Sequence, residues 1–129
     1  MADFNEQFNK FNDTPDTTSE YEAEDIEKNK VMALLSYLWI LFLVPLFAAK
    51  DSKFARFHAN QGIILAIIET VVSILFGILG NIPFIGWIFS ILSGLFDLVC
   101  LIFVFLGIYN AATGKAKELP IIGKYRILK

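Results

Sequence analysis

The feature that most constrains this chain is an apolar stretch over residues 62–109, interrupted once by Gly-Asn-Ile-Pro at residues 80–83. A helix needs about 20 apolar residues to cross a bilayer, and the sequence on each side of the break is long enough. We therefore expect a transmembrane helical hairpin with its turn near Pro83. Hydrophobic residues make up 56% of the chain and are concentrated between residues 31 and 112. This distribution leaves no room for a separate soluble domain with its own core.

A further apolar segment, residues 31–49, precedes the hairpin and is expected to form another membrane span. The region before it is long and acidic, unlike the short basic start of a signal peptide. The predicted fold class is therefore all-α: a polytopic transmembrane helical protein with three spans, at about residues 31–49, 60–79 and 84–110, which together form a domain over residues 31–112. In the alternative, with four spans, residues 84–112 split near Gly94.

The two ends of the chain carry opposite charge. Residues 1–27 hold nine of the thirteen acids and one of the eleven Lys/Arg, whereas the last fifteen residues hold five Lys/Arg and one acid. We expect residues 1–30 to be a disordered acidic tail. The alternative for its start is a short amphipathic helix that carries Phe4, Phe8 and Phe11 on one face.

The basic end sets the expected orientation. Residues 113–129 are predicted to lie as a basic tail on the cytoplasmic membrane surface. With three spans, the positive-inside rule places the C-terminus in the cytoplasm and the N-terminus outside, in a multi-pass protein of the bacterial plasma membrane. The four-span alternative places both termini inside. The basic residues are too few, and lack the stacking platform, to indicate nucleic acid as a partner.

One acid lies deep in each arm of the hairpin. Glu69 and Asp97 are each 14 residues from Pro83, so an antiparallel hairpin places them at the same depth, about 21 Å from the turn. Two carboxyl groups close together in hydrocarbon cannot both be ionised at neutral pH, so we expect at least one proton to be held there. Two interpretations remain open: a proton or cation site, and a protonated, hydrogen-bonded pair that fixes helix packing.

Small residues recur at four-residue spacing in both arms and lead towards the two acids. Such stripes allow membrane helices to approach each other closely, so we expect these residues to lie where the two arms pack. The predicted packing stripe consists of Ser73 and Gly77 in the first arm and Gly86, Ser90 and Gly94 in the second.

A dense group of polar and aromatic residues stands at the membrane boundary just before the first arm. We predict that this interface motif docks a partner or lipid headgroups. The alternative is simple anchoring by snorkelling Lys and Arg side chains. The motif consists of Phe54, Arg56, Phe57, His58, Asn60 and Gln61.

Signatures of enzymes and metal sites are missing from the sequence. His58 is the only histidine and Cys100 the only cysteine, and there is no nucleophile elbow, zinc-binding His motif or Gly-rich phosphate loop. We therefore expect no catalytic residues, no metal site and no cofactor. Cys100 itself is expected to be an inert packing residue.

Several segments resemble one family of small bacterial membrane proteins. These are Phe-Ala-Arg-Phe-His-Ala-Asn-Gln-Gly at residues 54–62, Ile-Pro-Phe-Ile-Gly-Trp at residues 82–87, and residues 107–123. The family is similar to the twenty-kilodalton Tic subunit, an import component of the chloroplast inner envelope. The resemblance covers roughly residues 31–128. It implies a polytopic α-helical membrane protein, and its plastid members, usually described with four spans, are linked to protein import.

Taken together, these features predict a non-enzymatic integral membrane protein that acts as a subunit or scaffold of a membrane complex. Its expected partners are the lipid bilayer and other membrane proteins, or further copies of itself. The alternative function is a small oligomeric channel or proton-linked transporter that uses Glu69 and Asp97.

Overall fold

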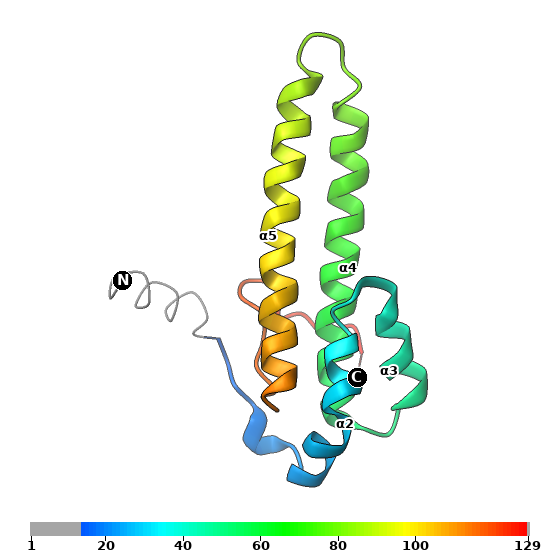
Figure 1. The fold of residues 1–129 in the computed structure, drawn as a ribbon, viewed down its shortest axis with the longest axis vertical. Coiled ribbons are helices and arrows are strands. Elements are labelled where there is room, and N and C mark those ends of the chain that lie inside the picture. The colour runs from blue at the N-terminus through cyan, green and yellow to red at the C-terminus, as the bar shows by residue number, and fades with distance from the viewer. Residues whose placement is uncertain (1–13, 129) are drawn as a thin grey trace, which may run out of the picture.

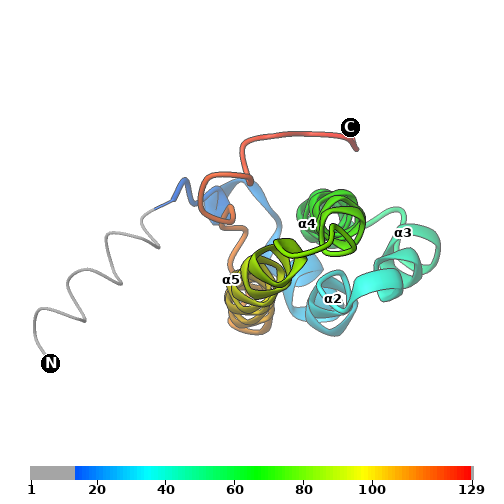
Figure 2. The same ribbon diagram turned by 90° about the horizontal axis from the view of Figure 1, so that it is seen from above.

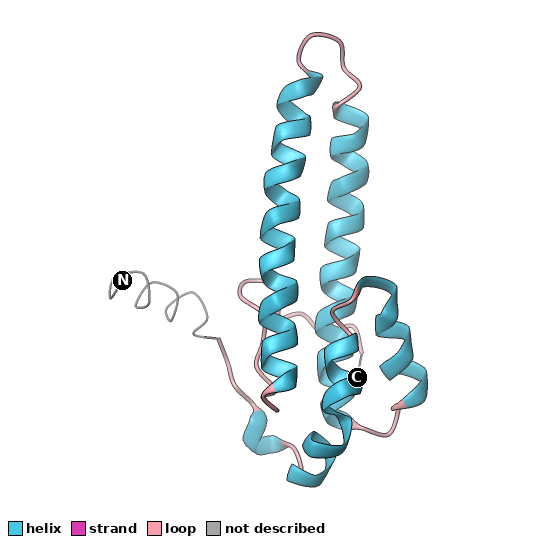
Figure 3. Ribbon diagram, viewed as in Figure 1, coloured by secondary structure: helices cyan, strands magenta, loops and turns pink. Residues whose placement is uncertain are grey.

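The structure is a computed structural model that describes residues 14–128, and within this range the chain is helical without strands (Figure 3). Two short 3-10 helices and four α-helices follow one another. They are η1 (Thr18–Glu20), α2 (Ala23–Leu35), η2 (Trp39–Phe42), α3 (Leu43–Ala48), α4 (Lys53–Leu79) and α5 (Gly86–Ala112). The amphipathic helix considered for Phe4, Phe8 and Phe11 lies outside the described residues.

The transmembrane hairpin is confirmed: α4 and α5 run antiparallel and are joined by a turn at one end (Figure 1). Each helix has 27 residues and is long and apolar enough to cross a membrane. At about 1.5 Å per residue, such a helix measures about 40 Å, more than the hydrocarbon thickness of about 30 Å. Because α5 continues without a break through Gly94, the four-span alternative is wrong.

The predicted span over residues 31–49 is wrong, because the segment folds into a short hairpin. Helix α2 ends at Leu35, the chain turns, and η2 and α3 return beside α2 towards the same end of the molecule (Figures 1 and 2). Leu38 leaves the helical region, with φ −98° and ψ 57°. Pro45 then stands in the first turn of α3, where its missing N–H costs nothing, whereas inside one long helix it would break the hydrogen-bonding ladder.

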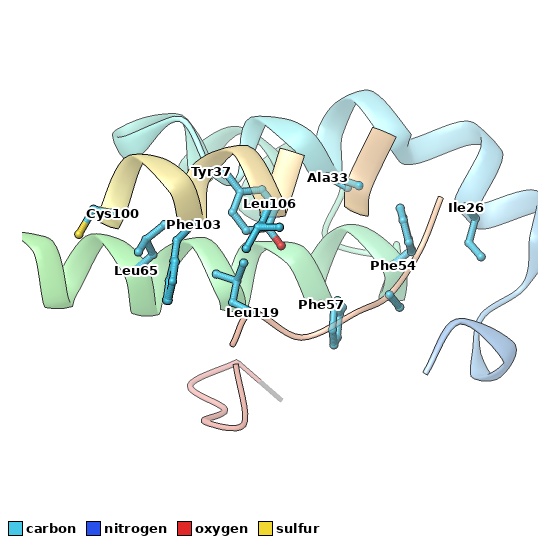
Figure 4. Close-up of a cluster of buried hydrophobic side chains, with 12 residues drawn as sticks. Ile26, Ala33, Tyr37, Phe54, Phe57, Leu65, Cys100, Phe103, Leu106 and Leu119 are labelled. Carbon is cyan, nitrogen blue, oxygen red and sulfur yellow. The ribbon is translucent and has the colours of Figure 1, made fainter. Parts of the chain in front are cut away.

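The tail after α5 folds back onto the start of α4. Ala116 and Leu119 are 0% and 1% exposed and belong to the same core as Phe54 and Phe57. Figure 4 shows this core where α2, α4, α5 and the tail meet, at the end of the hairpin remote from its turn. We call this end the base. The inner side of residues 113–128 is therefore packed against protein, a contact that the prediction of a surface tail did not include.

Part of the predicted disordered tail is also ordered in the base. Residues 14–18 run antiparallel to residues 116–118, with a single bridge between Asp16 and Lys117. The N–H of Thr17 donates to the carbonyl of Ala116 at 3.0 Å. Residues 22–30 lead into and form the first turns of α2. Disorder is thus a wrong prediction for residues 14–30, because backbone pairing and helix formation satisfy their polar groups.

The small residues of the predicted packing stripe bring α4 and α5 close only at the turn. A Cβ atom built on Gly86 would meet the carbonyl oxygen of Gly80 at 2.1 Å. At Gly77 and Gly94, by contrast, no atom lies within 4 Å of the Cβ position. Ser73 and Ser90 are exposed. Away from the turn, Ser73, Gly77 and Gly94 therefore lie on open helix surface, and their part in helix packing remains a prediction.

Candidate functional site

The base is assembled around the first three turns of α4, and Asp25 of α2 fixes where that helix begins. The Ser52 hydroxyl accepts a hydrogen bond from the Ala55 N–H at 3.0 Å and caps the helix. It also donates to Asp25, whose other carboxylate oxygen accepts from the Phe54 N–H at 3.0 Å. The negative charge thus lies at the positive end of the helix dipole.

These contacts decide the ionisation of Asp25. Partial burial acts to raise the pKa of its carboxyl group, but hydrogen bonds from Ser52, the Phe54 backbone and Asn29 outweigh it, so that the pKa lies below its ordinary value. The stabilisation from the charged carboxylate is present above the unfolded-state pKa and is lost as pH falls through the lower, folded-state pKa. Asp25 therefore ties α2 to α4 at neutral pH.

His58 lies at the centre of the base and is fully buried. The rings of Tyr37, Phe54 and Phe57 surround its imidazole edge-on, with centroid distances of 5.5, 4.9 and 5.1 Å. Its Nε2 lies 2.8 Å from the carbonyl oxygen of Lys115, which can only accept, so Nε2 carries the proton. Nδ1 is then the acceptor for the Tyr37 hydroxyl. Both nitrogens of a neutral imidazole are thereby satisfied.

The two amides that follow His58 hold the tail. The Gln61 side chain donates to the carbonyl of Gly123 at 3.0 Å and accepts from the N–H of Leu119 at 2.9 Å. The Asn60 side chain donates to the carbonyl of Tyr125 at 2.8 Å and accepts from the N–H of Ile127 at 2.6 Å. Each amide therefore replaces the backbone partners that an irregular segment lacks.

Two glycines allow the tip of the short hairpin to approach the long one. A Cβ on Gly62 would lie 1.8 Å from the carbonyl oxygen of Ser36, and a Cβ on Gly107 would lie 2.2 Å from the ring of Tyr37. Only hydrogen atoms fit at these positions of α4 and α5. The contact places the Tyr37 hydroxyl within reach of His58.

The structure thus places the interface motif inside the protein. Phe54, Phe57, His58, Asn60 and Gln61 are at most 6% exposed and bind other segments of this chain. Arg56 is half-buried, and the docking role predicted for the motif remains without a test. Sequence reasoning missed Tyr37 and Gly62, although a polar aromatic residue inside an apolar segment and a Gly next to a run of polar residues were visible signals.

The two membrane acids lie in different surroundings. Glu69 is half-buried beside a cavity of about 440 Å³ between the tip of the short hairpin and the long one. Asp97 is exposed on α5. Both carboxyl groups are within electrostatic range of the Cys100 thiol, so they share one region of the hairpin. Neither forms a hydrogen bond or ion pair with a described residue, and their direct pairing remains a prediction. The cavity is lined by Tyr37, Leu38, Gly62, Leu65, Ala66, Glu69 and Val104.

Comparison with known proteins covers both the base and the hairpin. Residues 28–127 match the MamF/MmsF family, described as the magnetosome magnetite crystal formation protein family. This chain belongs to the MamF/MmsF family. It is 35% identical to the magnetosome protein MmsF of Paramagnetospirillum magneticum over 96 residues, which cover 74% of this chain and 82% of that protein. It is also 32% identical to the magnetosome protein MamF of the same organism, covering 76% of this chain and 82% of that protein.

A relative named only as a membrane protein, from Methanocaldococcus jannaschii, is 45% identical over 57% of this chain and 61% of its own length. No solved structure matches the chain. The resemblance to the chloroplast import component is wrong, because the segments that carried it lie within the MamF/MmsF match and no Tic-like family is found. The chain is therefore a membrane protein of the MamF/MmsF family, and protein import has no support.

Proposed function

We propose that this MamF/MmsF-family protein is a non-enzymatic subunit of a membrane assembly, in which the base stabilises the fold and the hairpin meets other membrane helices. Within residues 14–128, no group of three or more His, Cys, Asp and Glu side chains is placed to hold a metal ion. The polar side chains of His58, Asn60 and Gln61 are occupied by contacts within the chain. The hairpin, in contrast, exposes large apolar side chains along both helices.

The observation that carries this proposal is the exposure of Asp97. An Asp facing lipid at a helix centre costs about 2.5–3.5 kcal/mol, and ionisable residues within membranes almost always face protein or water. Gly94 lies one turn before Asp97 and has open space around its Cβ position. Small residues beside a polar group are what associating membrane helices present to each other. We therefore assign this face of α5 to self-association.

A crosslinking experiment tests that face. In a Cys100→Ser background, Gly94→Cys should form a disulfide-linked dimer in native membranes, because a disulfide needs Cα atoms within about 7 Å. Leu92→Cys is the matched control, since Leu92 is exposed at similar depth but points to the other side of α5. Equal crosslinking at both positions, or none at Gly94→Cys while the protein co-purifies with other membrane proteins, would replace self-association with a different partner.

The distribution of basic residues supports a new topology in place of the one expected from three spans. All nine described Lys/Arg belong to the base, and the turn at residues 80–85 has none. With two spans and a short hairpin that returns to its own side, both termini share the basic side. The positive-inside rule then places both in the cytoplasm.

Topology reporters at the two ends decide this point. We expect fusions at residue 1 and at residue 129 both to report a cytoplasmic location, and a reporter inserted at residue 82 to report the opposite side. An N-terminal fusion on the opposite side from the C-terminal one would restore three spans.

A proton-linked channel or transporter is the second candidate function, favoured by the cavity beside Glu69. A half-buried carboxyl group next to a cavity in hydrocarbon is placed to bind a proton or cation. Glu69→Gln and Asp97→Asn separate the two functions. If the protein is a scaffold, both variants should co-purify with the same membrane proteins as the natural chain. If it is a proton-linked carrier, Glu69→Gln should abolish proton flux into reconstituted vesicles.

The names of the relatives connect the family to magnetosomes, and this chain's share in such an assembly is part of the proposal. The chain is also similar to a Methanocaldococcus jannaschii protein that is named only as a membrane protein, so its relatives are not all named as magnetosome proteins. Magnetite formation is therefore not assigned to this chain by family membership alone.

A further inference from the structure

The short hairpin ends near the middle of the membrane. Its tip residues Ile40 and Phe42 line a groove with residues of α4 as far along as Val71. From Val71 to the end of α4 at Leu79 there are eight residues, or about 12 Å of helix. Half of a hydrocarbon core of about 30 Å is about 15 Å. With Leu79 at the far boundary, the short hairpin therefore ends about 3 Å beyond the midplane, and the last ~12 Å on the far side contain α4 and α5 alone.

The outer face of the short hairpin is suited to lipid. Ile40 is 54% exposed and Phe47 71% exposed, and neither is covered by another described segment. Lys50 and Lys53 follow directly after α3, at the level expected for lipid headgroups. A segment inserted in one leaflet has this arrangement, with apolar side chains in the hydrocarbon and cations at the level of the headgroups. Three further exposed apolar residues complete this face: Leu41, Leu43 and Val44.

The protein is consequently wider in one leaflet than in the other. The short hairpin lies beside α4 and α5 at the basal end, whereas α4 and α5 alone continue beyond its tip (Figures 1 and 2). With helix diameters of about 10–12 Å including side chains, the two extra helices roughly double the cross-section on the basal side. A flat bilayer does not match such a tapered shape, so the mismatch is smaller when the basal leaflet is stretched on the convex side.

We propose that this protein recognises membrane curvature and favours bilayers whose convex surface is the leaflet containing the base. The partner is the lipid bilayer itself, and the inserted short hairpin supplies the asymmetry. The proposal rests on the two-span arrangement argued above, but it does not depend on self-association or on the acids. With the base in the cytoplasm, the favoured shape is a membrane that bulges into the cytoplasm, as in an invagination.

The test uses the full chain with a fluorophore fused after residue 129, reconstituted in giant vesicles of neutral phosphatidylcholine. Narrow tubes are pulled outward, and the protein density on the tube is compared with that on the vesicle. A membrane-impermeant quencher distinguishes molecules with the base outside from those with the base inside. Base-out molecules should be enriched on tubes about twofold, equivalent to about 0.4 kcal/mol. Base-in molecules should be depleted. A density ratio of one in both orientations would overturn the proposal.

Two variants identify the cause of sorting. Ile40→Ser combined with Phe47→Ser weakens insertion of the short hairpin and should bring the ratio to one, with helix content unchanged by circular dichroism. Lys28→Gln combined with Lys30→Gln changes basic residues in the middle of α2 without touching the apolar face, and this variant should be enriched on tubes as the natural chain is. Enrichment on tubes that persists in the Ile40→Ser/Phe47→Ser variant, or that is lost in the Lys28→Gln/Lys30→Gln variant, would contradict insertion of the short hairpin as the cause. The base-out fraction measured by the quencher reports the orientation of the molecules, and the reporters at residues 1 and 129 test the two-span topology separately from the sorting ratio.

Discussion

Gly62→Ala should destabilise the protein by about 3 kcal/mol or more, although it adds a single methyl group to a helix. The new Cβ would lie 1.8 Å from the carbonyl oxygen of Ser36, so α2 and α4 must separate. Overpacking a well-packed site costs about 1–3 kcal/mol, and a backbone neighbour gives way less easily than a side chain. Unfolding of the purified protein in mixed micelles, followed by circular dichroism against the fraction of SDS, measures the change.

Gly77→Ala is the matched control on the same helix. No atom lies within 4 Å of its Cβ position, and Ala is the better helix former by up to about 1 kcal/mol. The variant should therefore be as stable as the natural chain or slightly more so. Equal losses at the two glycines would show that α2 does not approach α4 at Ser36.

His58→Ala is expected to have the other large effect, a loss of about 3–5 kcal/mol in the free energy of unfolding. Removing a buried aromatic-sized side chain leaves a cavity. The Tyr37 hydroxyl and the Lys115 carbonyl also lose their partner, and each unsatisfied buried group adds about 1–3 kcal/mol before the site relaxes. The Lys115 contact ties the tail to α4, so trypsin should cut faster after Lys124 and Arg126 in this variant.

Lys53→Ala serves as its control, because Lys53 is exposed five residues before His58 on α4. Surface substitutions of this kind usually change stability by less than about 0.5 kcal/mol. If His58→Ala lost no more stability than Lys53→Ala and its tail was cut at the natural rate, the hydrogen bonds of the imidazole would not hold the base together.

The hairpin was predictable because apolar length and a Gly/Pro break are local properties of the sequence. The short hairpin was not predictable, since residues 31–49 are apolar enough for a span. Whether they form a span or a short hairpin depends on contacts of Ser36 and Tyr37 with α4 and α5. Pro45 was the one local signal against a single long helix. Length and hydropathy alone do not distinguish a span from a segment that enters and leaves on one side.

The sequence identified the residues of the interface motif but not the contacts that they make. The residues from Phe54 to Gln61 stood out by their density of polar and aromatic types, yet their partners are residues such as Lys115 and Gly123, more than fifty positions away. A sequence shows which side chains need hydrogen bonds but not which distant backbone supplies them. The packing stripe remains a prediction for a related reason, because spacing marks the face of a helix but not the neighbour that covers it.

The base also sets an order of events during synthesis. Its hydrogen bonds join residues 14–18 and 58–61 to residues 115–128, so the base closes only after residues 115–128 have left the ribosome. Contacts this distant along the chain carry a large loop-closure entropy and form late. The spans α4 and α5 contact each other along neighbouring sequence and are ready earlier. Insertion into the bilayer should therefore precede completion of the fold, and His58, Asn60 and Gln61 should wait with unpaired polar groups at the membrane boundary until the tail arrives.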